Sequence, residues 1–473
     1  MENPVYNDIL ALLNHSVKVE NSHVEIVDQI HLRDTIHRLA EVSALESGAR
    51  QGYARFLTRQ IALALGIFPA SIHDLYMARG RDEMPFSFTV PAINLRSMAF
   101  DSACSVFRAA RSLDAGVMIF EIARSEMGYT DQRPAEYATS VLAAAICEGF
   151  SGPVFIQGDH FQVSAKKYAA NPESELKGVK DVTKEAIAAG FFNIDVDTST
   201  LVDLSKKTIP EQQALNTSLS AMFTALIRQQ QPEGITISVG GEIGEVGGHN
   251  STEDELRRYM DGYLAELEKQ AHGVPGISKI SVQTGTSHGG VVLPDGSIAQ
   301  VSVDFNTLKH LSQIARKSYG MGGAVQHGAS TLPESAFGHF VENEACEVHL
   351  ATNFMNMLYD RLPADLKAEM YAYLDNTNAS ERKPDMTDEQ FYYKTRKNAI
   401  GPFKAKLWNL PEEKKAELGK AWEDQFLKLF TALGLRGTRK YAQQFIHPVA
   451  VKPSLKFYLG EAVETEDVSE LAD

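Results

Sequence analysis

Three histidines stand at the ends of short apolar runs that lie far apart in the sequence. His160 follows GPVFIQGD, His288 follows ISKISVQTGTS, and His327 follows MGGAVQ. Imidazole is a common metal ligand, and three imidazoles with an open fourth position describe a catalytic zinc site. One such histidine would more often be a core residue, but three at equivalent positions favour a shared site. We therefore expect one catalytic Zn²⁺ ion, with Co²⁺ or Fe²⁺ suiting the same ligands.

Glycine directly follows two of these histidines, in SHGG (287–290) and HGAS (327–330). Glycine lets the backbone approach a ligand closely, and the backbone N–H groups that follow can bind phosphate oxygens. Two such segments on late, adjacent elements predict a phosphate site.

The segment VGGEIGEVGGHNSTEDEL (239–256) is rich in glycine and then polar and acidic. It is typical of a mobile loop that closes over a substrate. It also fits a turn followed by a helix, with Ser251 or Thr252 as the N-cap and Glu255 reaching back. Both interpretations can hold, since the loop can end in that helix.

The elements that must position these residues are eight short apolar runs between about 86 and 358, most of them separated by amphipathic, helix-like segments. The runs are FSFTVPAIN, AGVMIFEIAR, GPVFIQGDHF, FFNIDVDTS, ITISVGGEIG, ISKISVQTGTSHG, MGGAVQHGAS and ACEVHLATN. Near-continuous apolar runs that alternate with helices indicate parallel strands covered on both faces. Eight such units predict an α/β fold, a (β/α)8 TIM barrel.

Polar or metal-binding residues end all eight runs. They are Asn94, Ser125, Asp159 with His160, Asp197 with Ser199, Glu242, His288, His327 with Ser330, and Thr352 with Asn353. In a parallel barrel these ends share one rim, where barrel active sites form. No lysine occupies any of these ends, which disfavours a lysine Schiff base.

Helical extensions flank the predicted barrel. The sequence divides into a helical N-terminal extension (1–83), the barrel (84–358) and a helical C-terminal extension (359–473). The C-terminal extension is expected to pack on the barrel or form an oligomer interface; the alternative is a lid or arm over an active site. Its last residues form an acidic tail.

Composition limits the classes of partner. The 473 residues carry a formal net charge of −15 without a basic stripe, which argues against nucleic acid or an anionic membrane as partner. Three widely spaced cysteines fit no disulfide framework and are expected to be reduced thiols. No apolar stretch is long enough for a signal peptide or a membrane span, so a cytoplasmic protein is expected.

The motifs resemble those of the class II, zinc-dependent fructose-bisphosphate aldolases and their tagatose-bisphosphate relatives, over about residues 86–356. The segments that carry the resemblance are VPAIN, GDHF, NIDVDTS, GGEIGEVGG, GTSHGG and QHGAS, in the family's order. The resemblance implies that His160, His288 and His327 hold the metal. Glu242 matches a glutamate that serves as an additional ligand, and Asp159 matches the catalytic acid/base.

Further roles carry over as candidate contacts to a sugar phosphate. The candidates are Asn94 and Asp197 for substrate or the metal surroundings, Gly289, Gly328, Ser330 and Thr352 for phosphate, and Ser125 and Asn353 as rim residues.

The sequence departs from the family at three places. An acidic pair usually follows the loop glycines, where this chain has His249 and Asn250; His249, Glu253 or Asp254 would then supply the proton-transfer base. Val292 replaces a frequent lysine. EVHLATN replaces the family's KxNxxTD, so that His349 stands at the asparagine position and Ala351 at the first aspartate position.

The resemblance implies a carbon–carbon lyase that reversibly cleaves a phosphorylated ketose. Fructose 1,6-bisphosphate, giving dihydroxyacetone phosphate and glyceraldehyde 3-phosphate, is the first expectation, and another ketose (bis)phosphate such as tagatose 1,6-bisphosphate is the alternative. A non-catalytic barrel subunit of an aldolase complex and a zinc hydrolase or isomerase on the same fold are the other hypotheses. A homodimer or homotetramer is expected from the family.

Overall fold

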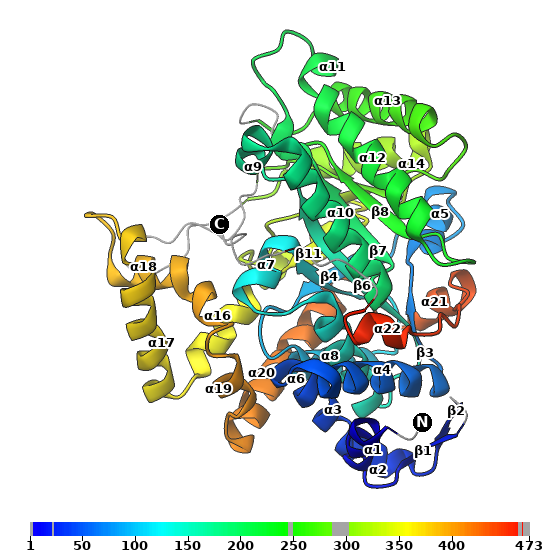
Figure 1. Ribbon diagram of the computed structural model, residues 1–473. Coiled ribbons are helices and arrows are strands. Elements are labelled where there is room, and N and C mark those ends of the chain that lie inside the picture. Colours follow the sequence, from blue (N-terminus) through cyan, green and yellow to red (C-terminus); the bar gives the residue numbers. More distant parts are fainter. Residues whose placement is uncertain (1–2, 21–22, 245–248, 286–301, 462–465, 467–473) are drawn as a thin grey trace.

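A closed barrel of eight parallel strands forms the centre of the computed structural model, which describes residues 3–20, 23–244, 249–285, 302–461 and 466 (Figure 1). The strands are β4 (Val90–Asn94), β5 (Ile119–Ala123), β6 (Gly152–Gln162), β7 (Asn193–Asp197), β8 (Ser238–Glu242), β9 (Lys279–Ser281), β10 (Ala324–Gln326) and β11 (Glu347–Leu350). Each pairs in parallel with the next, and β11 pairs with β4 to close the barrel. All eight correspond to the apolar runs, so the predicted (β/α)8 barrel is confirmed.

Helices follow the barrel strands along the chain and surround them. They are α6 (Ala99–Ser112), α7 (Arg124–Tyr129), α8 (Pro134–Cys147), α9 (Ala165–Ala170), α10 (Pro172–Ala189), α11 (Ile209–Gln212), α12 (Ala214–Gln230), α13 (Glu253–Gln270), α14 (Phe305–Tyr319), α15 (Phe337–Glu342) and α16 (Thr352–Arg361). Helix α13 begins with a capping box, in which Thr252 accepts from Glu255 N–H and the Glu255 carboxylate accepts from Thr252 N–H. The sequence predicted Ser251 or Thr252 as the N-cap of this helix, and the structure shows that Thr252 is the N-cap.

The N-terminal segment contains strands as well as the expected helices. Its helices are α1 (Pro4–Ala11), α2 (Gln29–Thr35), α3 (His37–Leu45), α4 (Gly48–Ala64) and α5 (His73–Gly80). An antiparallel pair, β1 (Val17–Glu20) and β2 (His23–Ile26), and the strand β3 (Ile67–Ala70) were not predicted. Strand β3 pairs with the first residues of β6 and so extends the barrel sheet. Helices α3 and α4 pack on α8.

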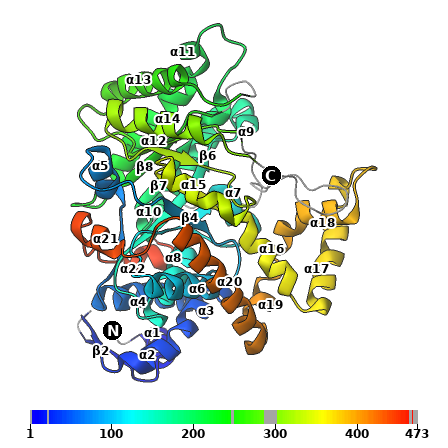
Figure 2. The ribbon, with the colours of Figure 1, turned by 180° about the vertical axis from the view of Figure 1, so that it is seen from behind.

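The C-terminal segment is helical. Its helices are α17 (Ala364–Thr377), α18 (Asp388–Thr395), the 3₁₀ helix η4 (Arg396–Ala399), α19 (Lys404–Trp408), α20 (Glu412–Ala432), α21 (Arg439–Phe445) and α22 (Leu455–Tyr458). Helices α17 to α19 lie on one side of the barrel and α21 and α22 on another, next to helices of the N-terminal segment (Figures 1 and 2). Helix α20 packs on α6 and α16, α22 returns to α4, and η4 packs on α7. Among the described residues, no helix has the length and apolar character needed to cross a membrane.

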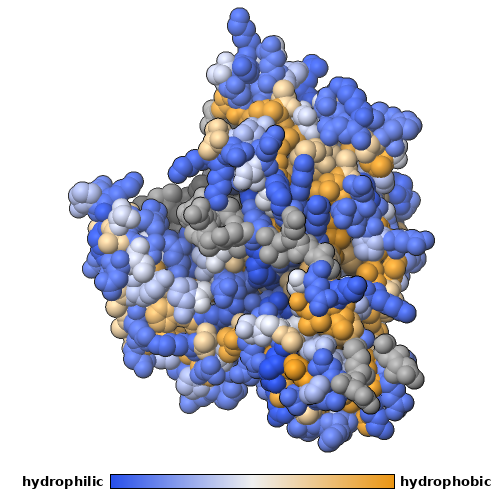
Figure 3. Space-filling view, in the orientation of Figure 1, coloured by the Kyte–Doolittle hydropathy of each residue, from blue (hydrophilic) through white to orange (hydrophobic). Residues whose placement is uncertain are grey.

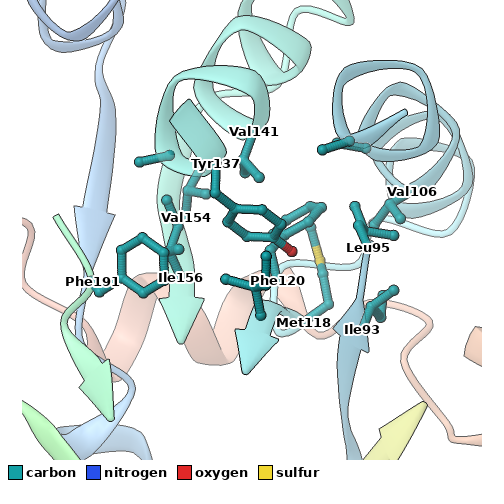
Figure 4. Close-up of a cluster of buried hydrophobic side chains, with 14 of the residues drawn as sticks. Ile93, Leu95, Val106, Met118, Phe120, Tyr137, Val141, Val154, Ile156 and Phe191 are labelled. Carbon is teal, nitrogen blue, oxygen red and sulfur yellow. The ribbon is translucent and has the colours of Figure 1, made fainter. Parts of the chain in front are cut away.

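The apolar core lies between the strands and the helices. In Figure 4, Ile93, Phe120 and Ile156 of neighbouring strands point outward and meet side chains of the covering helices, such as Val106 and Tyr137. The Tyr137 hydroxyl donates to the backbone oxygen of Glu121 at 2.6 Å, which anchors α8 to β5. Successive residues of a strand face opposite sides of the sheet. Since Phe120 points outward, the next residue, Glu121, faces into the barrel.

Candidate active site

Strand β6 places two consecutive functional side chains on the same side of the sheet. Asp159 and His160 would normally face opposite sides of a strand. The pairing of β6 with β7 shifts register between Gly158 and Phe161, and His160 adopts φ +40°, in the left-handed region. A Cβ at Gly158 would lie 2.4 Å from the Phe161 ring, so this bend requires glycine. The bulge therefore aims both side chains at the barrel mouth.

The side chains at the mouth form a compact group, which we call the mouth cluster: Asp159, His160, Asp197, Glu242 and His327. His160 Nδ1 lies 2.9 Å from Glu242 Oε1 and 3.0 Å from Asp197 Oδ2. His160 Nε2 lies 3.1 Å from His327 Nδ1. The strands β6, β7, β8 and β10 thus bring together residues that are far apart along the chain.

Electrostatics in this cluster favour a cation. Burial alone would lower the pKa of His160, but the Glu242 and Asp159 carboxylates outweigh burial and raise that pKa well above its usual value. Burial, with Asp197 beside it, raises the pKa of Glu242 to about 7. Several buried carboxylates thus compete for the positive charge that a protonated imidazole or a metal ion supplies.

The cluster fits a divalent metal. Ligand atoms of His160, Glu242 and His327 lie within 4.8 Å of one another. Two nitrogens bound to one tetrahedral zinc at its usual bond length stand roughly 3.3 Å apart, close to the 3.1 Å between the His160 and His327 nitrogens. Glu242 Oε1 is buried and faces the two imidazoles, with His160 Nδ1 at 2.9 Å and His327 Nε2 at 3.7 Å. Two imidazoles and a carboxylate also form a donor set that zinc accepts.

A pocket of about 830 Å³ opens over the cluster. Asp159, His160 and His327 lie in its wall, together with four of the predicted rim and phosphate residues: Ser125, Gly328, Ser330 and Thr352. Gly328 has φ +70°, a conformation that favours glycine. Helix α16 starts at Thr352, so its N-terminal N–H groups lie at this wall. Hydrophilic side chains dominate the face drawn in Figure 3, including the hollow near its centre.

Other predicted residues lie beside this pocket. Asp197 and Glu242 do not line the pocket themselves but contact the Nδ1 side of the His160 ring. Asn94 is buried and donates to Glu126 Oε2 at 2.6 Å. Asn353 lines a neighbouring cavity of about 390 Å³, which Ser330 also lines.

The structure does not bring any of the three candidate bases, His249, Glu253 and Asp254, to the described pocket wall. The His249 side chain is 54% exposed and contacts the Asn250 oxygen at 2.8 Å. Glu253 is 42% exposed and pairs with Arg257 at 2.8 Å and His310 at 2.9 Å on the outside of α13. His288 and Gly289 lie outside the described residues. All of these roles stay predictions.

Sequence reasoning missed a charged layer deeper in the barrel, which we call the inner network: Glu121, Gln157, Asp195, Lys279 and Glu347. Lys279 Nζ lies 2.9 Å from Asp195 Oδ1, 2.5 Å from Glu347 Oε1 and 2.8 Å from Gln157 Oε1. The signal was present in the sequence, because each of these residues interrupts an apolar run.

His349 connects the inner network with the mouth cluster. Its Nε2 lies 2.7 Å from Glu347 Oε1, while its Nδ1 lies 3.1 Å from Glu121 Oε2 and 3.3 Å from Asp159 Oδ1. Its ring stacks on His327 with centroids 3.9 Å apart. The departure at position 349 thus places an imidazole directly behind the expected acid/base.

Sequence reasoning also missed the far wall of the pocket. Residues between 383 and 397 line it, from the segment before α18, α18 itself and η4. We call this surface the C-terminal wall. Its charged members are Lys383, Asp385, Lys394, Arg396 and Lys397. Local periodicity carries no signal for such a wall, because the contact joins segments that are distant in the chain.

Comparison with known families identifies the family of the chain. The family model described as fructose-bisphosphate aldolase class-II matches residues 85–407. The chain belongs to this family. Its members are aldolases, which are lyases, and they generally depend on a metal. The match includes the barrel and also the C-terminal wall.

The chain is similar to several solved structures at low sequence identity. A probable tagatose 6 phosphate kinase from Sinorhizobium meliloti is 16% identical, with 79% of this chain and 97% of that chain covered and a TM-score of 0.50. The fructose-bisphosphate aldolase of Campylobacter jejuni is 16% identical over 76% and 93%, with a TM-score of 0.46. The YdjI aldolase of Escherichia coli is 13% identical over 78% and 99%, with a TM-score of 0.43. No curated protein sequence matches the chain.

Proposed function

We propose that the protein is a zinc-dependent aldolase that reversibly cleaves a phosphorylated ketose. Fructose 1,6-bisphosphate, giving dihydroxyacetone phosphate and glyceraldehyde 3-phosphate, is the first substrate to test, and tagatose 1,6-bisphosphate is the second. One observation carries the proposal: the clustered ligand atoms of His160, Glu242 and His327 lie next to Asp159 at the base of one pocket. A cytoplasmic location and a homodimer or homotetramer remain predictions.

His160, Glu242 and His327 would hold the metal, with His288 as a further predicted ligand. The metal would act as a Lewis acid toward the substrate oxygens and stabilise the negative charge that develops on the ketone half. Asp197 accepts a hydrogen bond from Gln162 at 2.6 Å and lies 3.0 Å from His160 Nδ1. Asp197 therefore orients the His160 ring.

Asp159 would move the proton. During cleavage, its carboxylate takes the proton of the hydroxyl group that becomes the aldehyde, and the electrons of the breaking carbon–carbon bond pass to the ketone half. In the condensation direction, Asp159 returns that proton. His349 holds the carboxylate from behind at 3.3 Å, which keeps it aimed at the pocket.

The ketone half would place its phosphate at the N-terminus of α16. Gly328, Ser330 and Thr352 line the pocket there. Ser330 Oγ accepts from Ala351 N–H at 2.7 Å, which fixes the loop after β10 against the start of the helix. Backbone N–H groups and the helix dipole suit a phosphate group.

A Schiff-base mechanism has poor support in the same barrel. Lys279 begins β9 and lies in the barrel interior, but a nucleophilic lysine must lose its proton near neutral pH. Burial alone would lower the pKa of Lys279, yet Asp195 and Glu347 outweigh burial and raise that pKa above its usual value. Lys279 therefore stays a cation that holds two carboxylates.

Cleavage of fructose 1,6-bisphosphate by the purified protein, followed as triose phosphate release, tests this function. Activity should disappear with a chelator, return with zinc and be absent from His160→Ala. His272→Ala is the matched control, since that side chain is 88% exposed at the end of α13. No cleavage with zinc bound would exclude this substrate and lead to other ketose phosphates. No cleavage and no bound metal would contradict the aldolase proposal and favour a non-catalytic subunit.

A further inference from the structure

Two cysteines that are far apart in the sequence lie next to each other on the outside of the barrel. Cys104 is on α6 and Cys147 is the last residue of α8, and these two helices pack directly against each other (Figure 1). Their sulfur atoms lie within 4.8 Å of each other. The Cys104 thiol donates a hydrogen bond to the Cys147 sulfur. Helix packing therefore creates a pair of thiols that the spacing in the sequence does not reveal.

The two thiols have different surroundings. Cys104 is buried, with 5% of the residue exposed, whereas Cys147 is half-buried at the end of α8. The hydrogen bond from Cys104 lowers the pKa of Cys147, and the positive charge of Arg108 acts in the same direction, against burial and the Glu148 carboxylate. Burial raises the pKa of Cys104 well above its usual value. Cys147 is therefore the thiol that ionises more readily and that a small molecule can reach from solvent.

A carboxylate also lies near the two sulfur atoms, but an arginine already binds it. One oxygen of Glu148 lies within 4.8 Å of both sulfur atoms. Arg108 Nη1 donates to Glu148 Oε1 at 2.6 Å, and Arg108 Nε donates to Glu423 Oε2 of α20 at 2.8 Å. Zinc in a structural site takes four ligands, so two thiols and a carboxylate held by an arginine make a poor metal site. The arrangement suits a bond between the two sulfur atoms instead.

We propose that Cys104 and Cys147 form a reversible disulfide when the protein meets a hydroperoxide, with Cys147 as the attacking thiolate and Cys104 as the resolving thiol. The sulfur atoms of a disulfide stand about 2 Å apart, and rotation of the two side chains, which already contact each other, brings them together. Neither cysteine lines the pocket over the mouth cluster. The oxidation site is therefore separate from the metal and substrate site and does not depend on the proposed function.

The reaction has two steps. The Cys147 thiolate attacks one oxygen of the hydroperoxide, so that a sulfur–oxygen bond forms, the oxygen–oxygen bond breaks and an alkoxide or hydroxide leaves. The Cys104 thiol then attacks the sulfur of the sulfenic acid, the sulfur–sulfur bond forms, and the hydroxyl group leaves as water with the Cys104 proton. The hydroperoxide gains two electrons and the two thiols lose two. A dithiol reductant reverses the change by thiol–disulfide exchange.

The third cysteine provides an internal comparison. Cys346 is fully buried directly before β11 and belongs to a different core cluster from Cys104. Burial raises the pKa of Cys346 to about 12. A buried thiol that stays protonated reacts slowly with peroxides. Cys346 should therefore remain reduced under conditions that oxidise the pair.

Peptide mass mapping of the full-length protein, with and without added zinc, tests the proposal. The reduced protein is treated with hydrogen peroxide, its remaining thiols are alkylated after unfolding, and the peptides are analysed without reduction. We expect a linked pair of peptides that contain Cys104 and Cys147, lighter than the two thiol peptides by two hydrogen atoms and separated by dithiothreitol. Cys346 should be alkylated throughout. Full alkylation of both Cys104 and Cys147, or a Cys147 sulfinic acid without the link, would overturn the proposal.

Three variants assign the roles within the pair. Cys104→Ala should accumulate the Cys147 sulfenic acid, which the diketone dimedone traps, whereas Cys147→Ser should leave Cys104 reduced because that thiol is buried. Cys346→Ala is the matched control and should keep the link. Cys147→Ser replaces a half-buried residue and keeps the test valid if Cys104→Ala does not fold. Oxidation of Cys104 in Cys147→Ser would reverse the roles and contradict the proposal, and a further zinc ion per chain that protects both thiols would make the pair a metal site instead.

Discussion

The inner network and the mouth cluster are two polar layers of one barrel, and they balance their charges differently. In the inner network, Lys279 lies between Asp195 and Glu347 at ion-pair distance. In the mouth cluster, no lysine or arginine among the described residues pairs with Asp197 or Glu242; imidazoles and neutral hydrogen-bond donors such as Gln162 approach these carboxylates instead. The inner network has its carboxylates compensated by a lysine of the chain as soon as the protein folds. The mouth cluster, which consists of carboxylates and imidazoles, is suited to a metal ion that binds from solution.

The difference separates stability from chemistry. A tethered lysine holds strands β7, β9 and β11 together, and its loss would leave buried carboxylates uncompensated. The mouth cluster contains no such cation, so its carboxylates and imidazoles can bind a metal. Substitutions in the inner network should therefore lower the free energy of unfolding, whereas substitutions in the mouth cluster should lower metal binding and activity.

The largest effect is expected at the mouth cluster. His327→Ala removes a predicted metal ligand, and since a metal contributes several kcal/mol to charge stabilisation, kcat/KM should fall about 10³-fold or more. Metal analysis of the purified variant should show less than one ion per chain, with the unfolding free energy of the metal-free protein nearly unchanged. His272→Ala is the control. Full metal content together with a large loss of stability would contradict the comparison.

Lys279→Met tests the inner network. The substitution leaves Asp195 and Glu347 buried without their cation, so the free energy of unfolding should fall by about 3–5 kcal/mol. Urea denaturation measures this loss, and Lys420→Met, at an exposed pair with Asp424, should stay within about 0.5 kcal/mol of the parent. Metal content of the folded fraction should be unchanged. A stable Lys279→Met protein without metal would reverse the roles of the two layers.

The sequence indicated which side chains gather in the mouth cluster, because a polar residue marks the end of each predicted strand. Each apolar run stops at a polar residue, and the barrel brings these ends to one rim, so the sequence alone was enough to name Asp159 and His327. The bulge that aims both Asp159 and His160 at the pocket was not predictable, since it depends on the register of β6 against β7. The role of Glu253 as a base stays a prediction, and in the structure its carboxylate pairs with Arg257 on the surface of α13.

The inner network and the C-terminal wall escaped prediction for two different reasons. A charged residue inside an apolar run, such as Lys279, is ambiguous in one sequence, because only the partners across the barrel show that it is paired. Arg396 lies in a helical extension whose local pattern is the same whether it covers the barrel or a pocket. Its role depends on contacts between segments that are distant in the chain, and the hydrophobic periodicity of the sequence gives no information about such contacts.

His349→Asn tests which of the two layers His349 belongs to, since this residue contacts Glu347 of the inner network and Asp159 of the mouth cluster. Removing these charge-assisted contacts should lower the unfolding free energy by about 1–3 kcal/mol. Bound metal should stay at the parent level, with a smaller fall in kcat than in His327→Ala. His339→Asn on the exposed side of α15 is the control. Loss of metal from His349→Asn would assign this residue to the mouth cluster instead.

The smallest expected effect is a pH dependence of stability that belongs to the inner network alone. Burial alone would raise the pKa of Glu347, but Lys279 outweighs burial and lowers that pKa from 4.5 to about 2. Below pH 4.5 the unfolded chain therefore takes up a proton that the native protein does not, and stability falls with acid. For this one group the loss is about 1 kcal/mol between pH 4.5 and 3.5. Glu347→Gln removes the titrating group, so its unfolding free energy should decline less steeply over that interval, and parallel curves would mean that Lys279 does not hold Glu347 ionised.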